Sequence, residues 1–305
     1  MAIGDLRKVT TGDCSDLYCL DTGMYDTEEY GAVYILDTER PAIVETGIGT
    51  NYEYILDALD ELDIAREDVA VIAPTHVHLD HAGGAGFLAE ECPNAEVYVP
   101  EIGARHLVDP GRLVEGTKRA VGDQWRFYAD PKPVPEDRVV ELTDGDVIDC
   151  GSHELEAVNA PGHAPHQMIF YDRQNDAVFT ADAAGIWVPS VEEIHVTSPP
   201  SNFDLDACLD DVETIREIAP TTLLYTHYGP RPYSDEAMDE YEDVLSQWVA
   251  AVEARRAAAE DDEAVVRHFV AEQEMDDVWG SEKARAEAAM NTRGVLHYLD
   301  THDDE

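Results

Sequence analysis

A short run of sequence, THVHLDH at residues 75–81, constrains this chain more than any other feature, because three histidines and an aspartate occupy six positions. The preceding run, VAVIA at residues 69–73, is apolar and β-branched and is followed by Pro74, which predicts a buried strand. His76 and His78 therefore leave the strand end and can project to the same side. Imidazoles and carboxylates are the usual ligands of zinc and neighbouring divalent metals. Because the chain has only 12 histidines in 305 residues, this grouping favours a metal site over a solvated polar loop.

The rest of the chain alternates between strand-like and helix-like stretches. Apolar residues at helical spacing predict helices, and short β-branched runs between Gly and Pro predict strands. The expected strands lie at 32–36, 42–44, 95–99, 139–142, 147–149, 155–158, 168–171, 177–180 and 222–225, and the expected helices at 50–64, near 87, at 101–128 with a break at 109–111, at 206–218, and beyond 234 with breaks near 261 and 280. This order predicts an α/β (α+β) fold with a sheet-rich core and helices on both outer faces.

The charge of the chain is far from zero, at −46, with 66 acidic residues against 20 basic ones. The acids are spread along the whole chain, and only four residues are lysines: Lys8, Lys118, Lys132 and Lys283. A strong net charge favours solubility and destabilises the compact state by self-repulsion, which salt screens. We therefore interpret the acidity as adaptation to a salty, halophilic cytoplasm, in preference to a surface for a basic partner. Nucleic acid is not expected as a partner, because phosphate contacts need basic patches.

The five cysteines do not predict a disulfide framework or a zinc knuckle, since their number is odd and none forms a Cys-x-x-Cys pair. The N-terminal residues lack the apolar core of a signal peptide. No apolar stretch approaches the length needed to span a membrane. A cytoplasmic protein without a membrane partner is therefore expected.

A complete metal site needs ligands beyond the cluster, because His78, Asp80 and His81 alternate too tightly for all of them to reach one ion. Three other segments place a histidine or aspartate just past an apolar run: APGHAPH at 160–166, TAD at 180–182 and YTHYG at 225–229. Loops at strand ends can present such side chains to a cleft.

Together, His-x-His-x-Asp-His, Gly-His, Asp and His, in this order, resemble the metallo-β-lactamase-fold hydrolase superfamily over about residues 20–230. The resemblance implies a four-layer αββα sandwich at residues 1–232 with a helical insertion at 101–135 near the cleft, and a C-terminal helical extension at 233–305. It also implies a dinuclear site. One metal would be held by His76, His78 and His163, and the second by Asp80, His81 and His227, with Asp182 bridging.

The metals that this resemblance implies are two Zn²⁺ ions, although Fe and Mn also occur in the family. A histidine at position 78 favours zinc and hydrolysis, whereas a glutamate there would point to the redox di-iron branch. Asp80 and Asp182 are the candidate catalytic residues, because they can orient a metal-bridging hydroxide and Asp80 can later shuttle a proton.

Two further residues are candidates for contacts with the metal ligands. The superfamily often carries Asp-Thr-Gly after an early strand, where the aspartate hydrogen-bonds a ligand, and here the sequence is Glu45-Thr46-Gly47. Glu45 can fill that role or be a surface acid. His166 lies three residues after His163 and is either a neighbour of the ligands or a helix-start residue. The histidines without a motif, His153, His195, His268, His297 and His302, are expected on the surface.

The segment 101–135 is unusual for its charge, with six basic and five acidic residues in a chain of −46. We expect basic residues here to receive an anionic group of a small-molecule substrate, such as a carboxylate; the alternative is that they pair with nearby acids on helix faces. The candidates are Arg105, Lys118, Arg119 and Arg126. His106 is a further candidate for the cleft, and Trp187 and Tyr228 are candidate pocket walls.

The favoured function is a dinuclear zinc hydrolase of a small ester, thioester or lactone, resembling glyoxalase-II-like thioesterases and acyl-homoserine lactonases. The acidic C-terminal region makes a glutathione thioesterase doubtful, because those enzymes use basic residues there. The alternatives are a one-iron enzyme resembling persulfide dioxygenases, a nuclease or phosphodiesterase of the same fold, and a metal-binding protein without turnover. The helices beyond 233 are expected either to cap the cleft or to form a homodimer.

Overall fold

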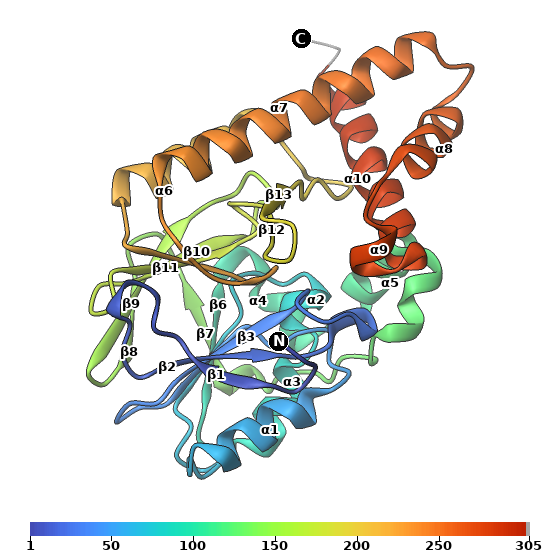
Figure 1. Cartoon of the computed structure of the whole chain (residues 1–305). Coiled ribbons are helices and arrows are strands. Elements are labelled where there is room, and N and C mark those ends of the chain that lie inside the picture. The colour runs from blue at the N-terminus through green and yellow to red at the C-terminus, as the bar shows by residue number, and fades with distance from the viewer. Residues whose placement is uncertain (303–305) are drawn as a thin grey trace.

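The computed structural model describes residues 1–302, which form two facing β-sheets with helices on both outer surfaces (Figure 1). The first sheet contains, in spatial order, β1 (Leu6–Lys8), β2 (Leu17–Asp21), β3 (Ala32–Leu36), β4 (Ala42–Val44), β5 (Val71–Ala73), β6 (Glu96–Pro100) and β7 (Val139–Leu142). The second sheet contains β15 (Gly229–Pro232), β14 (Thr222–Tyr225), β11 (Ala177–Ala181), β10 (Met168–Asp172), β9 (His153–Asn159) and β8 (Val147–Cys150). A small ribbon pairs β12 (Ile186–Val188) with β13 (Glu193–His195).

Both faces of the first sheet are apolar, which explains its nearly continuous hydrophobic strands. In β3, Val33 and Ile35 point to the outer face, where they join the cluster formed with the helices. Tyr34 and Leu36 alternate to the inner face and pack between the sheets. There the Tyr34 ring centroid is 5.4 Å from that of Phe179 in β11. The strand periodicity therefore fixes which side chains join the two sheets.

Helices complete the sandwich on both sides, which confirms the predicted four-layer αββα architecture. Residues of α1, α3 and α4 pack on the first sheet, and residues of α6 and α7 pack on the second. The helices are α1 (Tyr52–Glu61), α2 (Leu79–Ala82), α3 (Ala85–Glu91), α4 (Glu101–Val108), α5 (Gly111–Val121), α6 (Leu205–Ile218), α7 (Asp235–Ala258), α8 (Asp262–Glu272), α9 (Asp276–Trp279) and α10 (Ser281–His302). Short 3₁₀ turns lie at η1 (Thr11–Asp13), η2 (Met24–Asp26), η3 (Gly122–Phe127) and η4 (Glu136–Arg138).

The C-terminal helices leave the sandwich and return to one end of it (Figure 1). The long helix α7 runs outward, and α8 to α10 fold back so that α10 contacts α5, in the segment that was predicted to lie near the cleft. The last three residues of the predicted extension, 303–305, lie outside the described residues. Among residues 1–302, no helix combines the length and the apolarity that crossing a bilayer requires.

Candidate metal centre

The predicted metal ligands lie where several parallel strands end. In the first sheet β4 and β5 run parallel, and His76 comes three residues after β5. In the second sheet β11 and β14 run parallel; Asp182 directly follows β11, and His227 comes two residues after β14. Loops that follow the carboxyl ends of parallel strands share one edge of a sheet. The topology therefore gathers residues that are more than a hundred positions apart in sequence.

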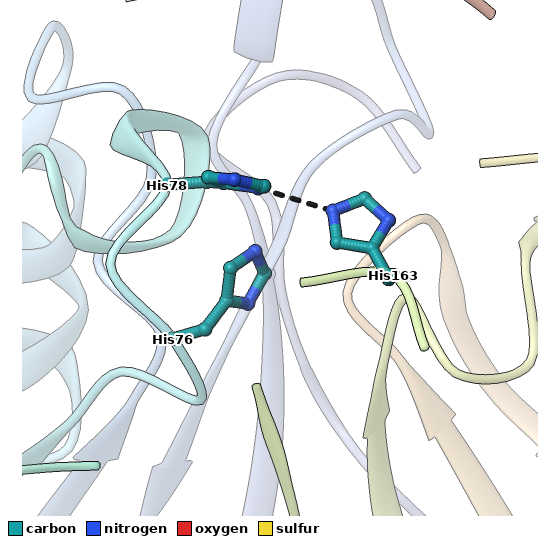
Figure 2. Close-up of side chains that lie close together, drawn as sticks. All are labelled: His76, His78 and His163. Carbon is teal, nitrogen blue, oxygen red and sulfur yellow. Dashed lines mark hydrogen bonds between the residues drawn. The ribbon is translucent and has the colours of Figure 1, made fainter. Parts of the chain in front are cut away.

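One group of candidate ligands consists of three histidines from two loops. The ring nitrogens of His76, His78 and His163 lie within 4.8 Å of one another. His78 Nδ1 is 3.0 Å from His163 Nε2, and the three rings converge on a common space (Figure 2). Three imidazoles with a free direction toward a cleft form a donor set that suits a catalytic zinc ion.

The second group combines Asp80, His81 and His227, whose candidate ligand atoms also lie within 4.8 Å of one another. Asp80 Oδ2 is 4.0 Å from His81 Nε2 and 3.9 Å from His227 Nε2. The other ring nitrogen of His227, Nδ1, lies 2.9 Å from the carbonyl oxygen of Tyr30, which orients the imidazole with Nε2 toward the group.

Asp182 lies between the two groups. Its Oδ2 is 2.9 Å from His81 Nε2, 3.7 Å from His76 Nε2 and 3.8 Å from His163 Nε2. Its other oxygen, Oδ1, is 3.9 Å from His227 Nε2. One carboxylate thus reaches histidines of both groups, as a residue shared by two ions must.

Several of these buried atoms are acceptors that face each other without a donor between them, which suits a bound divalent cation. His81 Nδ1 lies 3.0 Å from Glu45 Oε1, so in the neutral ring we assign the proton to Nδ1 and leave Nε2 as an acceptor. That acceptor faces Asp182 Oδ2, and both Asp182 Oδ2 and His76 Nε2 are buried without a hydrogen-bond partner among the described residues. Buried acceptors that face each other are unfavourable unless a cation lies between them. The donor set therefore fits metal binding.

Glu45 is buried, with 1 % of its surface exposed, so it is not a surface acid. Its Oε1 accepts hydrogen bonds from Thr75 Oγ1 at 2.5 Å and Thr226 Oγ1 at 3.0 Å, and its Oε2 accepts from the Thr75 backbone N–H at 3.2 Å. Glu45 has a backbone φ of +69°, which lies in the left-handed region that residues other than glycine rarely adopt. The structure therefore holds this carboxylate against His81 from both sheets, which is the arrangement expected of a partner to a metal ligand.

His76 and His78 have the charge state that metal ligands need. Burial, together with the neighbouring histidines, holds the pKa of His76 and His78 well below its usual range, which keeps both rings neutral. Burial opposes the charged form of His81 as well, but the Glu45 and Asp182 carboxylates outweigh it and raise the pKa of that ring, so a metal ion bound at its Nε2 would displace a proton. For Asp182, burial is outweighed by His163, His81 and His227, which lower the pKa of the carboxyl and keep it ionised.

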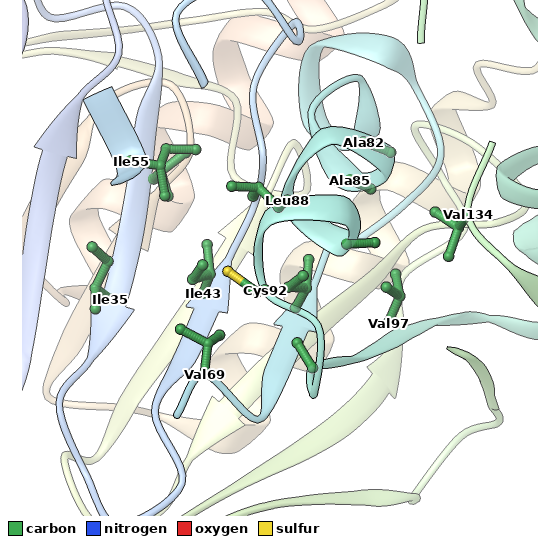
Figure 3. Packing of buried hydrophobic residues seen from close by; sticks show 14 of the residues in the cluster. Ile35, Ile43, Ile55, Val69, Ala82, Ala85, Leu88, Cys92, Val97 and Val134 are labelled. Atoms are coloured by element: carbon green, nitrogen blue, oxygen red, sulfur yellow. The ribbon is translucent and has the colours of Figure 1, made fainter. Parts of the chain in front are cut away.

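Small residues anchor the loop that carries the cluster. Ala82 and Ala85 pack into the apolar cluster beside Leu88 on the outer face of the first sheet (Figure 3). At Gly84 a Cβ would come within 2.2 Å of the Thr46 carbonyl oxygen, so only glycine permits this close approach. The Gly83-Gly84 pair therefore lets the ligand loop press against the segment that follows Glu45.

The loop that carries His163 is held from the other side by α6. The backbone N–H of Gly162 donates to Asp211 Oδ2 at 2.8 Å. Burial raises the pKa of the Asp211 carboxyl to about 7, and the hydrogen bond from Gly162 only partly offsets this. Asp211 is a positioning residue, and sequence reasoning did not single it out.

A cavity of about 410 Å³ opens above the candidate ligands, and His78, Asp80, His163, Asp182 and His227 reach it. Its walls come from α5, from the loop at 197–202 and from α10. Much of the lining is apolar, including Leu79, Leu113, Ile186 and Met290. The cavity can therefore receive a small molecule with an apolar part directed at the ligands.

Only some of the residues predicted to contact the substrate line this cavity. Arg119 and His106 line it, but Arg105 and Lys118 do not. Lys118 Nζ lies 4.4 Å from the Trp125 ring centroid and 3.6 Å from Asp130 Oδ1, so it has the neighbouring partners that the alternative interpretation expected.

The other candidates from the same prediction are also occupied elsewhere. Arg126 Nη2 pairs at 2.6 Å with Glu282 of α10, away from the cavity. Trp187 is turned away because its neighbour Ile186 faces the cavity and successive strand residues alternate. The Arg231 guanidinium lies 3.9 Å from the Trp187 ring centroid. Tyr228 is buried in the cluster between the sheets, so its prediction as a pocket wall is wrong.

The remaining histidines divide between the cavity and the protein interior. His166 lines the cavity, and burial together with His163 lowers its pKa to about 4. The predicted surface position of His153 is wrong: the ring is 2 % exposed, and its Nδ1 lies 2.9 Å from Asp172 Oδ2. His195 is half-buried, because its edge faces Trp279 with the ring centroids 5.3 Å apart. These partners of both imidazoles are distant in sequence, so the burial of the two rings could not be predicted from local motifs.

The cavity residues that were not identified from the sequence include five with polar or charged groups: Tyr25, Tyr30, Arg112, Lys283 and Glu287. Arg112 lies in the same basic segment as Arg105 but on the next helix, and the direction of its side chain depends on how α5 is placed. Lys283 and Glu287 come from α10, more than fifty residues after the last metal-ligand motif. The only available signal was that Lys283 is one of four lysines.

Comparison with known proteins agrees with this fold. The sequence model of the metallo-beta-lactamase superfamily matches residues 26–227. A metallo-beta-lactamase fold-containing protein of Sulfurisphaera tokodaii is 26% identical over 222 residues, which is 71% of this chain and 79% of that protein. The solved structure of an archaeal metallo-beta-lactamase superfamily protein from Sulfolobus tokodaii superposes with a TM-score of 0.70 at 22% identity, covering 93% of this chain and 99% of the other.

Two relatives carry the names of hydrolases. An acyl-coenzyme A thioesterase of Bos taurus is 24% identical over 54% of this chain, and a hydroxyacylglutathione hydrolase of Bdellovibrio bacteriovorus is 25% identical over 55%. The matches span 62% and 53% of those two proteins. With the family match covering every candidate ligand, the chain belongs to the metallo-beta-lactamase superfamily and is a metal-dependent hydrolase of that fold.

Proposed function

We propose that this protein is a dinuclear zinc hydrolase that cleaves a small acyl thioester, with esters and lactones as alternative substrates of the same chemistry. The observation that carries the proposal is the position of Asp182 between two complete three-residue groups. A site for one ion would not need the second group of Asp80, His81 and His227. Two bound zinc ions would supply an acidified water and a Lewis acid for the developing oxyanion.

The residues of the chain have separate tasks in this proposal. Asp182 and the histidines orient the reacting groups at the cavity floor, where burial excludes bulk water. Asp80 is 28% exposed on its cavity side and is free to hold the proton of the attacking water and return it to the leaving group. Glu45 keeps His81 in one tautomer, so that its Nε2 faces inward.

A thioester is favoured over an ester or a lactone by the chemistry of its leaving group and by the relatives. The apolar lining beside Leu113 and Met290 suits the acyl chain of any of these substrates. A thiolate is a weaker base than an alkoxide, so it can depart before it is protonated. Two relatives of the chain are named for thioester hydrolysis.

Metal analysis and a substrate panel test the proposal. We expect two zinc per purified full-length chain, and hydrolysis of acyl thioesters that a chelator abolishes and added Zn²⁺ restores. The panel should include a neutral ester, a lactone and a phosphodiester, all assayed in molar KCl to screen the −46 charge. One iron per chain without any hydrolysis would contradict the proposal.

A matched pair of variants separates the site from the rest of the protein. His163→Ala removes a residue of the first group and should lower the zinc content and abolish turnover. His297→Ala removes an exposed histidine of α10 and should change neither. Equal behaviour of the two variants would count against the assigned ligands.

A further inference from the structure

A second cavity of about 810 Å³ adjoins the metal cavity, and nothing in the proposed hydrolytic chemistry uses it. It lies between α5 with η3 on one side and α8 with α10 on the other. The two cavities share Arg119, Ala120 and Val121 at the end of α5. Because both cavities reach these residues, they are neighbours at the end of α5, although they contact different residues of α10. We call the two cavities together the channel.

Arginines from three helices line this channel: Arg112 and Arg119 of α5, Arg267 of α8, and Arg285 and Arg293 of α10. They represent five of the 20 basic residues in a chain with 66 acids. Four of the five, all but Arg112, line the second cavity together with three acids, Asp123, Glu263 and Glu282. The second cavity therefore has a small excess of positive charge on a protein of strongly negative charge.

Three of these arginines stand out because they lack acidic partners. Among residues 1–302, Arg112, Arg119 and Arg285 have no carboxylate within 4.0 Å of their guanidinium nitrogens. Elsewhere on the surface, by contrast, Arg216 pairs with three carboxylates at 2.6–3.1 Å. Unpaired guanidinium groups at the walls of a cavity are available to an anionic ligand.

The other two arginines are only loosely engaged. Arg267 Nη2 is 3.8 Å from Asp261 Oδ1, and Arg293 Nη2 is 3.6 Å from Glu263 Oε1, both between exposed side chains. Such pairs contribute little to stability, so exchanging them for a ligand costs little. Arg285 and Arg293 are eight positions apart on α10, which is about 12 Å along a helix axis. The two arginines are therefore too far apart for a single carboxylate or phosphate to contact both.

We propose that the channel binds a leaving group that carries several phosphates, so that the substrate is the acyl thioester of a phosphorylated carrier such as coenzyme A. This inference rests on the proposed thioester hydrolysis. The acyl carbon lies at the metal ligands, where the oxygen of water bonds to it as the C–S bond breaks, and the thiolate takes up a proton. The products are a carboxylic acid and the free carrier thiol, and the phosphates remain on the arginines until release.

The first test compares two thioesters of the same acyl group, hexanoyl-coenzyme A and hexanoyl-N-acetylcysteamine, which lacks the phosphates. In the wild-type enzyme, kcat/KM should favour the coenzyme A thioester. The double variant Arg119→Ala/Arg285→Ala should shrink this preference at least about tenfold, since hydrogen bonds between guanidinium and phosphate groups are among the stronger ones. The loss should appear mainly in KM, because the arginines lie away from the reacting bond.

The matched control is Arg173→Ala, which removes an exposed arginine that pairs with Glu156 on the second sheet, outside both cavities. It should leave the preference between the two thioesters unchanged. A thioester of glutathione forms a third arm, because its leaving group carries carboxylates but no phosphate. If the wild-type enzyme favours glutathione, or if the preference for coenzyme A survives in the double variant, the assignment is overturned.

A binding measurement decides the inference independently of turnover. Adenosine 3′,5′-bisphosphate and free coenzyme A, titrated calorimetrically into the wild-type protein, should bind and should bind at least about tenfold more weakly to the double variant. Absence of binding to the wild type would overturn the inference even if thioesters are hydrolysed. Binding without hydrolysis of any thioester would support the channel and instead contradict the proposed function.

Discussion

Two buried clusters of charge line the cavity, and they differ in whether their polar atoms find hydrogen-bond partners. The first cluster consists of the candidate metal ligands, and we call it the metal cluster. In it, hydrogen-bond acceptors face acceptors: His81 Nε2 lies 2.9 Å from Asp182 Oδ2, and the buried His76 Nε2 has no partner among the described residues. The second cluster, which we call the clasp, contains Lys283, Glu287 and Asn291 of α10 together with Tyr30. In the clasp the two opposite charges pair with each other, and Glu287 also accepts hydrogen bonds.

The clasp joins the C-terminal helices to the sandwich. Lys283 Nζ contacts Glu287 Oε2 and lies 4.1 Å and 4.2 Å from the ring centroids of Tyr25 and Tyr30. Glu287 accepts hydrogen bonds from Tyr30 Oη at 2.9 Å and Asn291 Nδ2 at 3.1 Å. Burial is outweighed by Lys283, which lowers the pKa of the Glu287 carboxyl. Buried charge by itself therefore does not indicate a metal site. Buried hydrogen-bond acceptors without a donor do indicate one.

The largest expected effect comes from removing the shared charge of the metal cluster. Asp182→Asn should lower kcat/KM at least about 10³-fold, because metal-ion catalysis supplies several kcal/mol of transition-state stabilisation. Zinc content measured by mass spectrometry should fall in parallel. Wild-type activity in Asp182→Asn would show that this carboxylate is not shared by the ions.

The clasp predicts a loss of stability instead. Lys283→Met leaves the buried Glu287 carboxylate without its cation and should reduce the free energy of unfolding by about 3–5 kcal/mol, as for other broken buried ion pairs. Urea denaturation measures it. The control Lys132→Met breaks the exposed pair with Glu90 and should cost less than about 1 kcal/mol. Equal losses in the two variants would remove the contrast between the clusters.

A smaller effect should follow from the residue that orients His81. Glu45→Gln retains the shape of the side chain but weakens the hydrogen bond to His81 Nδ1, so zinc affinity should fall by about 10–100-fold. Competition with a zinc chelator measures the affinity. Glu39→Gln, which changes an exposed carboxylate that accepts from the Ser152 backbone N–H, serves as the control. No change in Glu45→Gln would mean that the other contacts of Glu45 matter more than its bond to His81.

The smallest effect depends on pH and concerns Asp211, which holds the His163 loop. Burial raises the pKa of its carboxyl from 3.8 to about 7, so the folded chain retains a proton that the unfolded chain releases. Its contribution to stability is therefore present at low pH and declines as pH rises from about 4 to about 7. Asp211→Asn should stabilise the protein by about 1–3 kcal/mol at pH 8 and have little effect at pH 4. Thermal unfolding at both pH values tests this, and a uniform effect would exclude the proton linkage.

The metal cluster could be predicted because its signals are local in sequence. Four short motifs follow apolar runs, and the end of a strand already determines which edge of the sheet a loop will join. The breaks in the C-terminal helices were local too. Asp261 begins α8 by accepting a hydrogen bond from the Ala264 backbone N–H, and Gly280, with φ of +77°, separates α9 from α10.

The clasp and the channel could not be predicted, since their members become neighbours only through packing between distant helices. Lys283 and Glu287 are four positions apart, which in an acid-rich helix indicates an ordinary surface pair. The basic segment at 101–135 was recognised, but which of its arginines face the cavity depends on the rotation of α5. The short ribbon of β12 and β13, with three residues in each strand, was also missed.

The part of the cavity wall that α10 supplies has a consequence for how the protein can change. All candidate metal ligands lie between residues 76 and 227, whereas Lys283, Glu287, Met290 and Asn291 bring α10 to the cavity. This part of the wall is thus inherited on a separate stretch of the gene from the ligands. Substitutions in a few codons near position 290 can reshape the cavity while every ligand stays in place.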